Sequence, residues 1–358
     1  RPLTHLSAPM NISIYPGMKC NLSCSFCFVS QEKWDDDNIV RPLEEWIPIL
    51  DQIKAMEIPY LTILGGEPLM YPHIWEMLDY LDSIGQKVHV TTNGTIVTDE
   101  LIANLKKHPT LTLKVSVQAM NEKHTQLTKG SLTRALHFIE AVRGAGIDCG
   151  IHMVGLPENI DQAPLVADYA AEQGLFEFSM GVFFNINQVD LEEFSLEEYR
   201  DIHQKIQRHI NEKHDGSLKY RLEGCQLWTS EPSLEWATLP QTPFEILKSG
   251  CEAAQARVEI MNDGTVLGCA LFNKHEFGAG NAFETPFKQI WRESQVFAEL
   301  RSLQTEDAAC GSCQFDYFCK GGCPALNHKK TGNLRAGDDR CHIRTAIITG
   351  EELPVIVS

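Results

Sequence analysis

Six short apolar segments alternate with six amphipathic ones between residues 11 and 210, which predicts six strands that are each followed by a helix. The expected strands are residues 11–15, 60–64, 87–91, 111–117, 148–154 and 176–180. The expected helices are residues 43–56, 73–84, 132–143, 164–173 and 196–210, with another that begins near residue 99. Strands and helices in this order form a parallel sheet with right-handed crossovers. Because six units are too few for an eight-stranded barrel, we expect an α/β fold with an open, TIM-like (β/α)6 partial barrel, whose ligands bind at the carboxyl ends of its strands.

Three cysteines, Cys20, Cys24 and Cys27, follow the first expected strand within eight residues. A loop of this length can hold three irons of one four-iron cluster and leave the fourth iron without a protein ligand. The alternative is structural zinc, which needs four ligands, but the next cysteine along the chain is Cys149. The spacing therefore indicates a cluster with one open, reactive iron.

This spacing, with Phe26 directly before the third cysteine, resembles the signature of the radical S-adenosylmethionine (SAM) enzymes. In that family the open iron chelates the amino and carboxylate groups of SAM. An electron from the cluster then cleaves SAM to a 5′-deoxyadenosyl radical, which takes a hydrogen atom from the substrate. The resemblance implies the same cofactors and the same first step for this chain.

The segment Gly65-Gly66-Glu67-Pro68 resembles the family's methionine-binding loop. Two glycines let the backbone approach the ligand, and carbonyls or a carboxylate can accept from the ammonium of SAM. Many relatives have Asp where this chain has Gln118, and the alternative for Lys129 is a solvated loop charge. The SAM-contacting residues that the resemblance implies are Phe26, Gly65, Gly66, Glu67, Pro68, Thr92, Asn93, Ser116 and Lys129.

A second cysteine array begins at Cys251 and, with Gly264 before its second cysteine, resembles the SPASM extension of radical SAM enzymes. The resemblance implies two auxiliary [4Fe–4S] clusters, and therefore three clusters in all. The distal cluster would bind Cys310, Cys313, Cys319 and Cys341, and the nearer one Cys251, Cys269 and Cys323. The fourth ligand of the nearer cluster is Cys225, or else that iron is open and Cys225 is a free thiol. Four-thiolate zinc is the alternative for the array.

Length and composition agree with two domains: a barrel over residues 1–215, a linker over 216–248, and a SPASM domain with a tail over 249–358. The sequence Asn262-Asp263-Gly264 predicts a hairpin inside the second domain. Cys149 lies among apolar residues and is expected to be a core thiol.

A formal charge of −17 argues against nucleic acid or an anionic membrane as partner, and no apolar run reaches the ~18 residues of a membrane span. Closely spaced thiols without a secretory segment favour a cytoplasmic metal-binding protein.

The resemblance implies hydrogen abstraction from a peptide, giving a crosslink, thioether, epimerisation or oxidation as in ribosomal peptide maturation. Anaerobic sulfatase maturation ranks second, because Ala270 stands where those enzymes have Asp after the second SPASM cysteine. A small-molecule oxidoreductase of cofactor biosynthesis and a non-radical iron–sulfur electron carrier are further alternatives. The complete methionine loop argues against the electron carrier.

The expected partners are a peptide substrate and a reductant such as flavodoxin or ferredoxin. Only nineteen residues precede Cys20, so a leader-binding domain is a separate protein, has been lost, or is replaced by another surface. The sequence identifies no general base, and the catalytic residues stay unknown. Glu177, His152 and Asn185 lie near expected strand ends, where they line the pocket or serve the fold.

Overall fold

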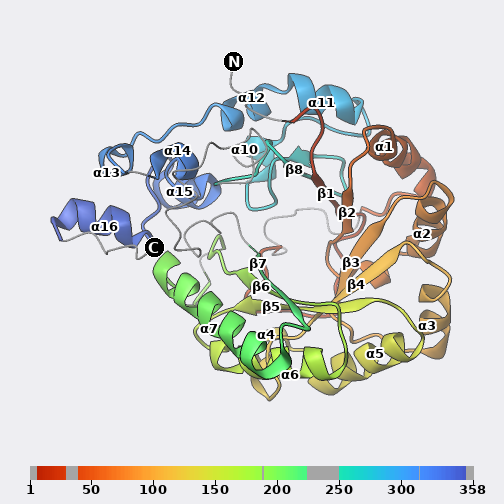
Figure 1. Cartoon of the computed structure of the whole chain (residues 1–358). Helices are drawn as coiled ribbons and strands as arrows, with labels where there is room; N and C mark the ends of the chain where they lie inside the picture. Colours follow the sequence, from red (N-terminus) through yellow and green to blue (C-terminus); the bar gives the residue numbers. More distant parts are fainter. Residues whose placement is uncertain (1–5, 30–38, 188, 224–249, 314, 352–358) are drawn as a thin grey trace.

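One sheet with the strand order β7-β6-β5-β4-β3-β2-β1-β8-β9 lies at the centre of the molecule (Figure 1). The structure is a computed structural model and describes residues 6–29, 39–187, 189–223, 250–313 and 315–351. Neighbouring strands are parallel except for the antiparallel pair β8–β9, and among the described residues β7 and β9 do not pair with each other, so the barrel is open. The strands are β1 Asn11–Ile14, β2 Tyr60–Ile63, β3 Val88–Thr92, β4 Leu111–Ser116, β5 Cys149–Gly155, β6 Glu177–Val182, β7 Lys219–Glu223, β8 Arg257–Ile260 and β9 Val266–Leu267.

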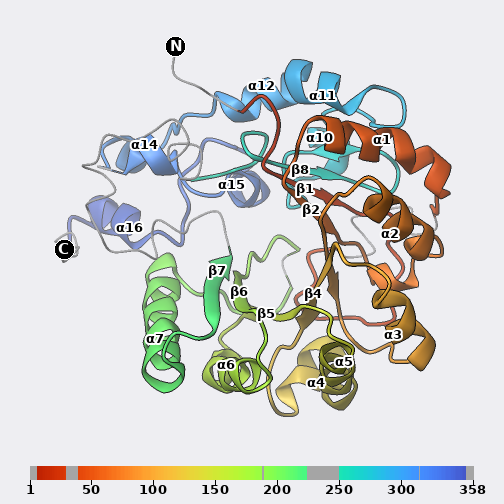
Figure 2. The same cartoon turned by 45° about the vertical axis from the view of Figure 1, so that its right-hand side comes forward.

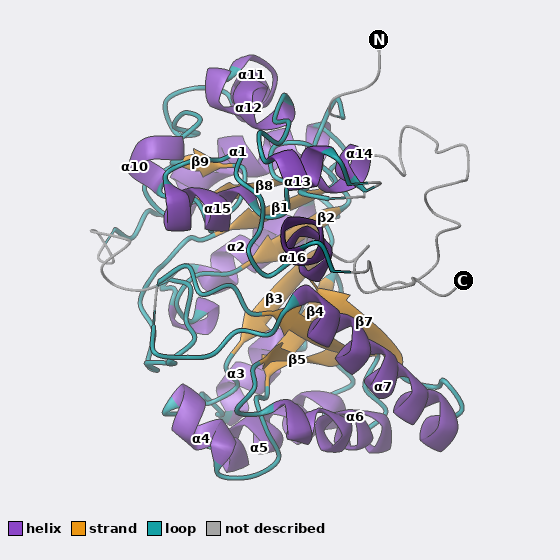
Figure 3. Ribbon diagram, turned by 90° about the vertical axis from the view of Figure 1, so that its left-hand side faces the viewer, coloured by secondary structure: helices purple, strands orange, loops and turns teal. Residues whose placement is uncertain are grey.

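Helices cover the outside of the sheet (Figure 2). They are α1 Leu43–Ala55, α2 Ile74–Ser83, α3 Asp99–Leu105, α4 Lys123–Thr128, α5 Leu132–Gly144, α6 Ala163–Glu172 and α7 Leu196–His214, with the 3₁₀ turns η1 Pro68–Met70 and η2 Ile160–Gln162. The C-terminal part contains α10 Lys274–Phe277, α11 Phe287–Glu293, α12 Gln295–Arg301, α13 Ala308–Gly311, α14 Asp316–Cys319, α15 Pro324–Thr331 and α16 His342–Thr349 (Figure 3). No helix among the described residues is both long and apolar enough to cross a membrane.

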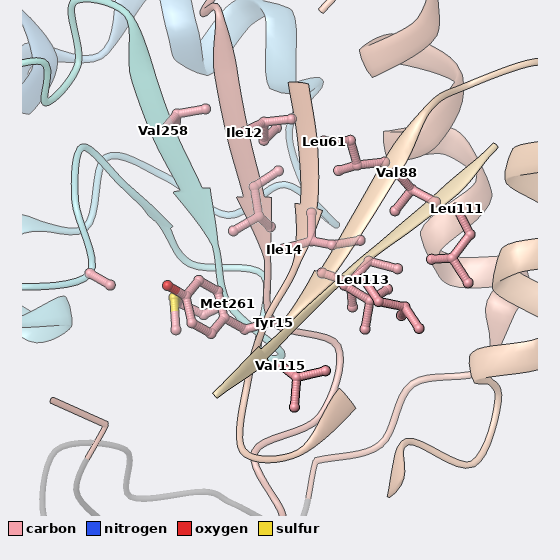
Figure 4. Packing of buried hydrophobic residues seen from close by; sticks show 14 of the residues in the cluster. Ile12, Ile14, Tyr15, Leu61, Val88, Leu111, Leu113, Val115, Val258 and Met261 are labelled. Atoms are coloured by element: carbon pink, nitrogen blue, oxygen red, sulfur yellow. The ribbon is translucent and has the colours of Figure 1, made fainter. Parts of the chain in front are cut away.

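Side-chain alternation explains how the sheet presents two different faces. In β4, Leu111, Leu113 and Val115 are buried in the hydrophobic core under the helices, together with apolar residues of β1, β2, β3 and β8 (Figure 4). The residues between them, such as Lys114, point to the inner face of the barrel, where Lys114 meets charged groups of β6 and β7. The inner face is therefore polar and the outer face apolar.

All six predicted strands are present, and their ends differ from the predicted ends by two residues at most. The assignment of residues 216–248 to a linker is wrong for residues 219–223, which form the seventh parallel strand, β7. Helix α4 was also not predicted. The hairpin around Gly264 is confirmed as β8–β9, but β8 pairs with β1 and so continues the barrel sheet into the C-terminal part.

Candidate functional site

The three-cysteine loop follows β1 and is held by two distant segments of the barrel. The backbone N–H of Ser25 donates to the carbonyl of Leu127 at the end of α4, at 2.9 Å. Asn187, in the loop after β6, donates its side-chain amide to the carbonyl of Cys27 at 2.8 Å. Cys20 is exposed and Cys24 and Cys27 are partly buried. These contacts place three thiols at the carboxyl end of the sheet, as the sequence predicts.

The three thiols lie close enough to influence one another. Burial is the largest cause that raises the pKa of Cys24, and the neighbouring Cys27 and Cys20 add to it. Together they raise this pKa to about 12. Burial also raises the pKa of Cys20. A thiol with such a pKa stays protonated at neutral pH unless a metal replaces the proton, so metal binding at this loop would release protons.

The described cysteines do not form a group with the close spacing of a zinc site. A tetrahedral zinc with bonds of about 2.3 Å needs sulfurs about 3.8 Å apart. Within the described ranges, the one group of three or more His, Cys, Asp or Glu donor atoms that all lie within 4.8 Å of one another is Asp168, His209 and His214, which contains no cysteine. No three of the described cysteines lie this close together, which is compatible with thiolates that each bind a different iron.

Gly65 and Gly66 bring the next loop directly against the cysteine loop. A Cβ on Gly66 would lie 2.3 Å from the carbonyl oxygen of Met18 and 2.4 Å from that of Lys19, and Gly65 has φ +138°. The N–H of Gly66 donates to the carbonyl of Gly17, at 3.1 Å. The two glycines are therefore required by the approach to the cysteine loop itself, a reason that the sequence did not reveal.

The carboxylate of Glu67 is used within the protein. Its side chain accepts from the Thr92 hydroxyl at 2.7 Å, from the Asn93 N–H at 2.7 Å and from the Leu69 N–H at 3.1 Å, and the residue is 2% exposed. Burial raises the pKa of Glu67, and these hydrogen bonds oppose the rise. The sequence predicted that either a carboxylate or backbone carbonyls of this loop accept from the ligand. Because the carboxylate already accepts three hydrogen bonds, the backbone carbonyls are the acceptors that remain for a ligand.

The four cysteines predicted to bind the distal cluster come together in the C-terminal part. Burial is the largest cause that raises the pKa of Cys319, and the next are Cys341 and Cys310. Burial is also the largest cause that raises the pKa of Cys341, and Asp338 and Cys313 make smaller contributions in the same direction. Asp307 caps α13 by accepting from the N–H of Cys310 at 3.0 Å. The structure therefore brings these four thiols into one electrostatic group.

The three cysteines predicted for the nearer cluster lie on neighbouring segments. Cys251 lines a small cavity together with Cys319 and with Gly322 and Pro324, the residues on either side of Cys323. Gly268, which precedes Cys269, packs against residues 253–254. The candidate fourth ligand, Cys225, lies outside the described residues.

A network of charges, with Glu177 buried at its centre and Arg221 partly exposed, lies on the inner face between β4, β6 and β7. Lys114 Nζ lies 2.7 Å from Glu177 and 2.6 Å from Glu223, and Arg221 lies 3.1 Å and 2.8 Å from the same two carboxylates. Glu177 is 2% exposed. Because Lys114 and Arg221 form ion pairs with its carboxylate, Glu177 stabilises the barrel and is a poor general base.

His152 and Asn185, the two other candidates, have different environments. His152 Nδ1 lies 3.0 Å from the Ser179 hydroxyl and 3.5 Å from Glu223, and burial lowers its pKa. A neutral imidazole on the inner face can accept a proton, so His152 stays a candidate. Asn185 donates to the carbonyls of Val189 and Leu191 and so holds its own loop.

Comparison with known proteins matches the three-cysteine loop and the first four cysteines of the second array to families. Residues 14–170, which include the three-cysteine loop, match the radical SAM superfamily, and residues 251–314 match the SPASM iron–sulfur cluster-binding domain. The chain belongs to the radical SAM enzymes that carry a SPASM domain. It therefore binds iron–sulfur clusters and SAM.

Similar proteins cover almost the whole chain. Mycofactocin maturase MftC of Mycolicibacterium smegmatis is 26% identical over 340 residues, which is 94% of this chain and 83% of that protein. An AdoMet-dependent heme synthase of Methanosarcina barkeri is 25% identical over 334 residues, which is 91% of this chain and 94% of that protein. The crystal structure of Streptococcus suis SuiB bound to its precursor peptide SuiA has a TM-score of 0.85 at 26% identity, with 94% of this chain and 77% of that chain covered.

The other SAM contacts predicted for this radical SAM enzyme are distributed around the cysteine loop. Ser116 ends β4 and is half-buried, and Phe26 packs against a small apolar cluster that includes Leu127 and Phe183. Lys129 is exposed, and its ammonium donates to the carbonyl of Gln126 in the same turn at 2.8 Å. This contact favours the reading of Lys129 as a solvated charge over a SAM contact.

Asn21 is a residue of the site that sequence reasoning missed. Its side-chain oxygen accepts from Asn93 at 2.8 Å, and its side-chain amide donates to the Thr95 hydroxyl at 2.8 Å. Asn21 thus links the cysteine loop of the radical SAM domain to the end of β3. Asparagine directly after the first cysteine was the only signal in the sequence.

Gly66→Ala is expected to lower SAM cleavage about tenfold or more. The new methyl group meets the carbonyls of residues 18 and 19, and relieving such a contact costs about 1–3 kcal/mol by moving the cysteine loop. The measurement is 5′-deoxyadenosine formation with dithionite. Gly144→Ala in α5 is the matched control, since a Cβ there meets nothing within 4 Å. Equal rates of 5′-deoxyadenosine formation in wild type and Gly66→Ala would contradict the close approach of residue 66 to the cysteine loop.

Proposed function

We propose that this chain is a peptide-modifying radical SAM/SPASM enzyme that abstracts hydrogen from a ribosomally made precursor peptide. The observation that carries the proposal is similarity along 94% of the chain to SuiB, whose structure contains a precursor peptide. The similarity to mycofactocin maturases over the same share of the chain supports it.

The residues of the chain have separate tasks in this reaction. Cys20, Cys24 and Cys27 hold the cluster that, when bound, supplies the electron that cleaves SAM to a 5′-deoxyadenosyl radical. The carbonyls of residues 65–68 accept from the ammonium of SAM, and Glu67 fixes their direction through Thr92 and Asn93. His152, on the inner face, is the proposed acceptor of a substrate proton.

The C-terminal cysteines hold two auxiliary [4Fe–4S] clusters in this proposal. Cys310, Cys313, Cys319 and Cys341 bind the distal one, which their common electrostatic grouping supports. Cys251, Cys269 and Cys323 bind the nearer one, with Cys225 as fourth ligand. These clusters accept the electron that an oxidative product releases. A flavodoxin or ferredoxin supplies the first electron, and a separate protein can bring the leader peptide.

A small-molecule reaction is the second candidate, because the heme synthase of Methanosarcina barkeri matches along 94% of its own length. Sulfatase maturation has less support. The enzyme anSMEcpe with bound AdoMet is 16% identical at a TM-score of 0.68, which shows a common fold alone, and Ala270 is an apolar buried residue that takes no proton.

The experiment that separates these functions follows hydrogen transfer into 5′-deoxyadenosine. The reconstituted enzyme is incubated anaerobically with SAM, dithionite and either deuterated precursor peptides encoded beside its gene or an iron porphyrin. Deuterium in 5′-deoxyadenosine and a changed peptide mass are the expected results. Turnover with the porphyrin and none with any peptide would favour the small-molecule reaction.

A further inference from the structure

The outer helical layer carries a group of metal-type donor atoms that the radical SAM chemistry does not use. Asp168 lies on α6, and His209 and His214 lie near the end of α7, which packs beside α6 (Figures 2 and 3). His214 ends α7 shortly before β7 begins at Lys219. Parallel strands all begin at the same end of the sheet. The group therefore lies toward the amino ends of the strands, whereas the cysteine loop lies at their carboxyl ends.

The donor atoms of the three side chains converge on one point. His209 Nε2 lies 2.8 Å and His214 Nε2 lies 2.7 Å from the same oxygen, Asp168 Oδ1. All three atoms lie within 4.8 Å of one another. The Asp168 and His214 side chains are 12% and 13% exposed, and that of His209 is 30% exposed. The group is thus mostly enclosed and open to water on the side of His209.

The carboxylate is prepared to act as an anionic ligand. Lys213 Nζ donates to its other oxygen, Oδ2, at 2.6 Å, which fixes its orientation and leaves Oδ1 to the two imidazoles. Ligating carboxylates in metal sites are commonly oriented in this way by an outer hydrogen bond.

We infer that Asp168, His209 and His214 form a binding site for Zn²⁺ or a similar first-row divalent ion. Two imidazole nitrogens and one carboxylate oxygen are a donor set that these ions prefer, and water on the side of His209 completes the tetrahedron. Bonds of about 2.0–2.1 Å place such ligands about 3.3 Å apart, so each imidazole nitrogen moves away from the Asp168 oxygen by only about 0.5 Å on binding. The ion binds where two imidazole protons otherwise point at one oxygen.

The bound ion joins α6 to the C-terminal end of α7. The chain turns from there directly into β7, the edge strand that contributes Arg221 and Glu223 to the charged inner face. The site therefore stabilises the last strand of the barrel. The alternative is a metal-free network of hydrogen bonds between the same side chains, and the two predict different metal contents.

The test is equilibrium dialysis of the cluster-loaded enzyme against ZnCl₂, followed by zinc and iron analysis. Wild type is expected to retain one zinc per chain more than Asp168→Asn, and zinc is expected to raise the Tm of wild type but not that of Asp168→Asn. His137→Ala, at an exposed position on α5, is the matched control and keeps the ion.

His209→Ala is the second variant, because it removes a ligand and leaves Asp168 paired with Lys213 and His214. It decides the result if Asp168→Asn does not fold. Any zinc bound at the cysteines is the same in wild type and in every variant, so it does not affect the difference in zinc content between them. Equal zinc content in wild type and the folded variants, or no zinc in wild type, would overturn the inference.

Discussion

Replacing both Cys24 and Cys27 by alanine is expected to abolish 5′-deoxyadenosine formation and to leave the C-terminal clusters in place. A cluster held by Cys20 alone has lost two of its three protein ligands. The variant should contain about eight irons per chain, against about twelve in wild type, because one four-iron cluster is missing. No other cysteine among the described residues lies in this loop to replace them.

The measurement combines iron analysis after anaerobic reconstitution with a dithionite-driven assay for 5′-deoxyadenosine. Cys149→Ala is the matched control, because Cys149 is a fully buried thiol of β5 in the hydrophobic core, and this variant should keep its iron and its activity. SAM cleavage by the double variant would refute the assignment of the cluster. Loss of all iron would show instead that the two cysteine sets depend on each other for folding.

Features that depend on local spacing could be predicted from the sequence. The cysteine spacings, the glycine-rich loop and the six strand–helix units are each encoded within a few residues, and they indicated the family and the open barrel. The buried position of Cys149 also followed from its apolar neighbours, and the structure confirms it.

Features that depend on distant partners could not be predicted. The strand β7 contains Lys219, Arg221 and Glu223 on one side and reads as a polar segment, because its stabilising partners Lys114 and Glu177 lie on other strands. The same holds for β8, whose pairing with β1 joins residues far apart in the sequence.

Glu67 illustrates the limit within the site itself. Its position in the methionine loop indicated a ligand contact, but its partners Thr92 and Asn93 lie 25 and 26 residues away. Only the folded structure shows that the carboxylate is already satisfied.

Lys114→Met is expected to destabilise the barrel by about 3 kcal/mol at neutral pH. Lys114 contacts the carboxylates of both Glu177 and Glu223, and its removal leaves buried negative charge with fewer cations. This is the lower end of the range for breaking a buried ion pair, because Arg221 still contacts both carboxylates. Methionine keeps most of the side-chain volume, so packing changes little.

The loss of stability should depend on pH. Burial acts to raise the pKa of Glu177, but Lys114 and then Arg221 outweigh it and lower this pKa below its ordinary value. The pKa of Glu223 is lowered too, because His152, Lys114 and Arg221 together outweigh burial. A lowered pKa contributes stability that is complete above the unfolded value of about 4.3 and is lost as pH falls through the folded value. The difference between wild type and Lys114→Met should therefore be largest between pH 7 and about 4.3, and it should shrink as the pH falls below that value.

Lys123→Met provides the matched control for this effect. Lys123 Nζ lies 2.7 Å from Asp161, the same distance as between Lys114 and Glu177, but the side chains of the control pair are 33% and 57% exposed. An exposed pair contributes about 0.2–1 kcal/mol, so urea unfolding at several pH values should show a small change that varies little. Similar losses for the two variants would mean that burial of the inner network adds nothing to its strength. A loss for Lys114→Met that does not change with pH would mean that its packing, and not its charge, stabilises the barrel.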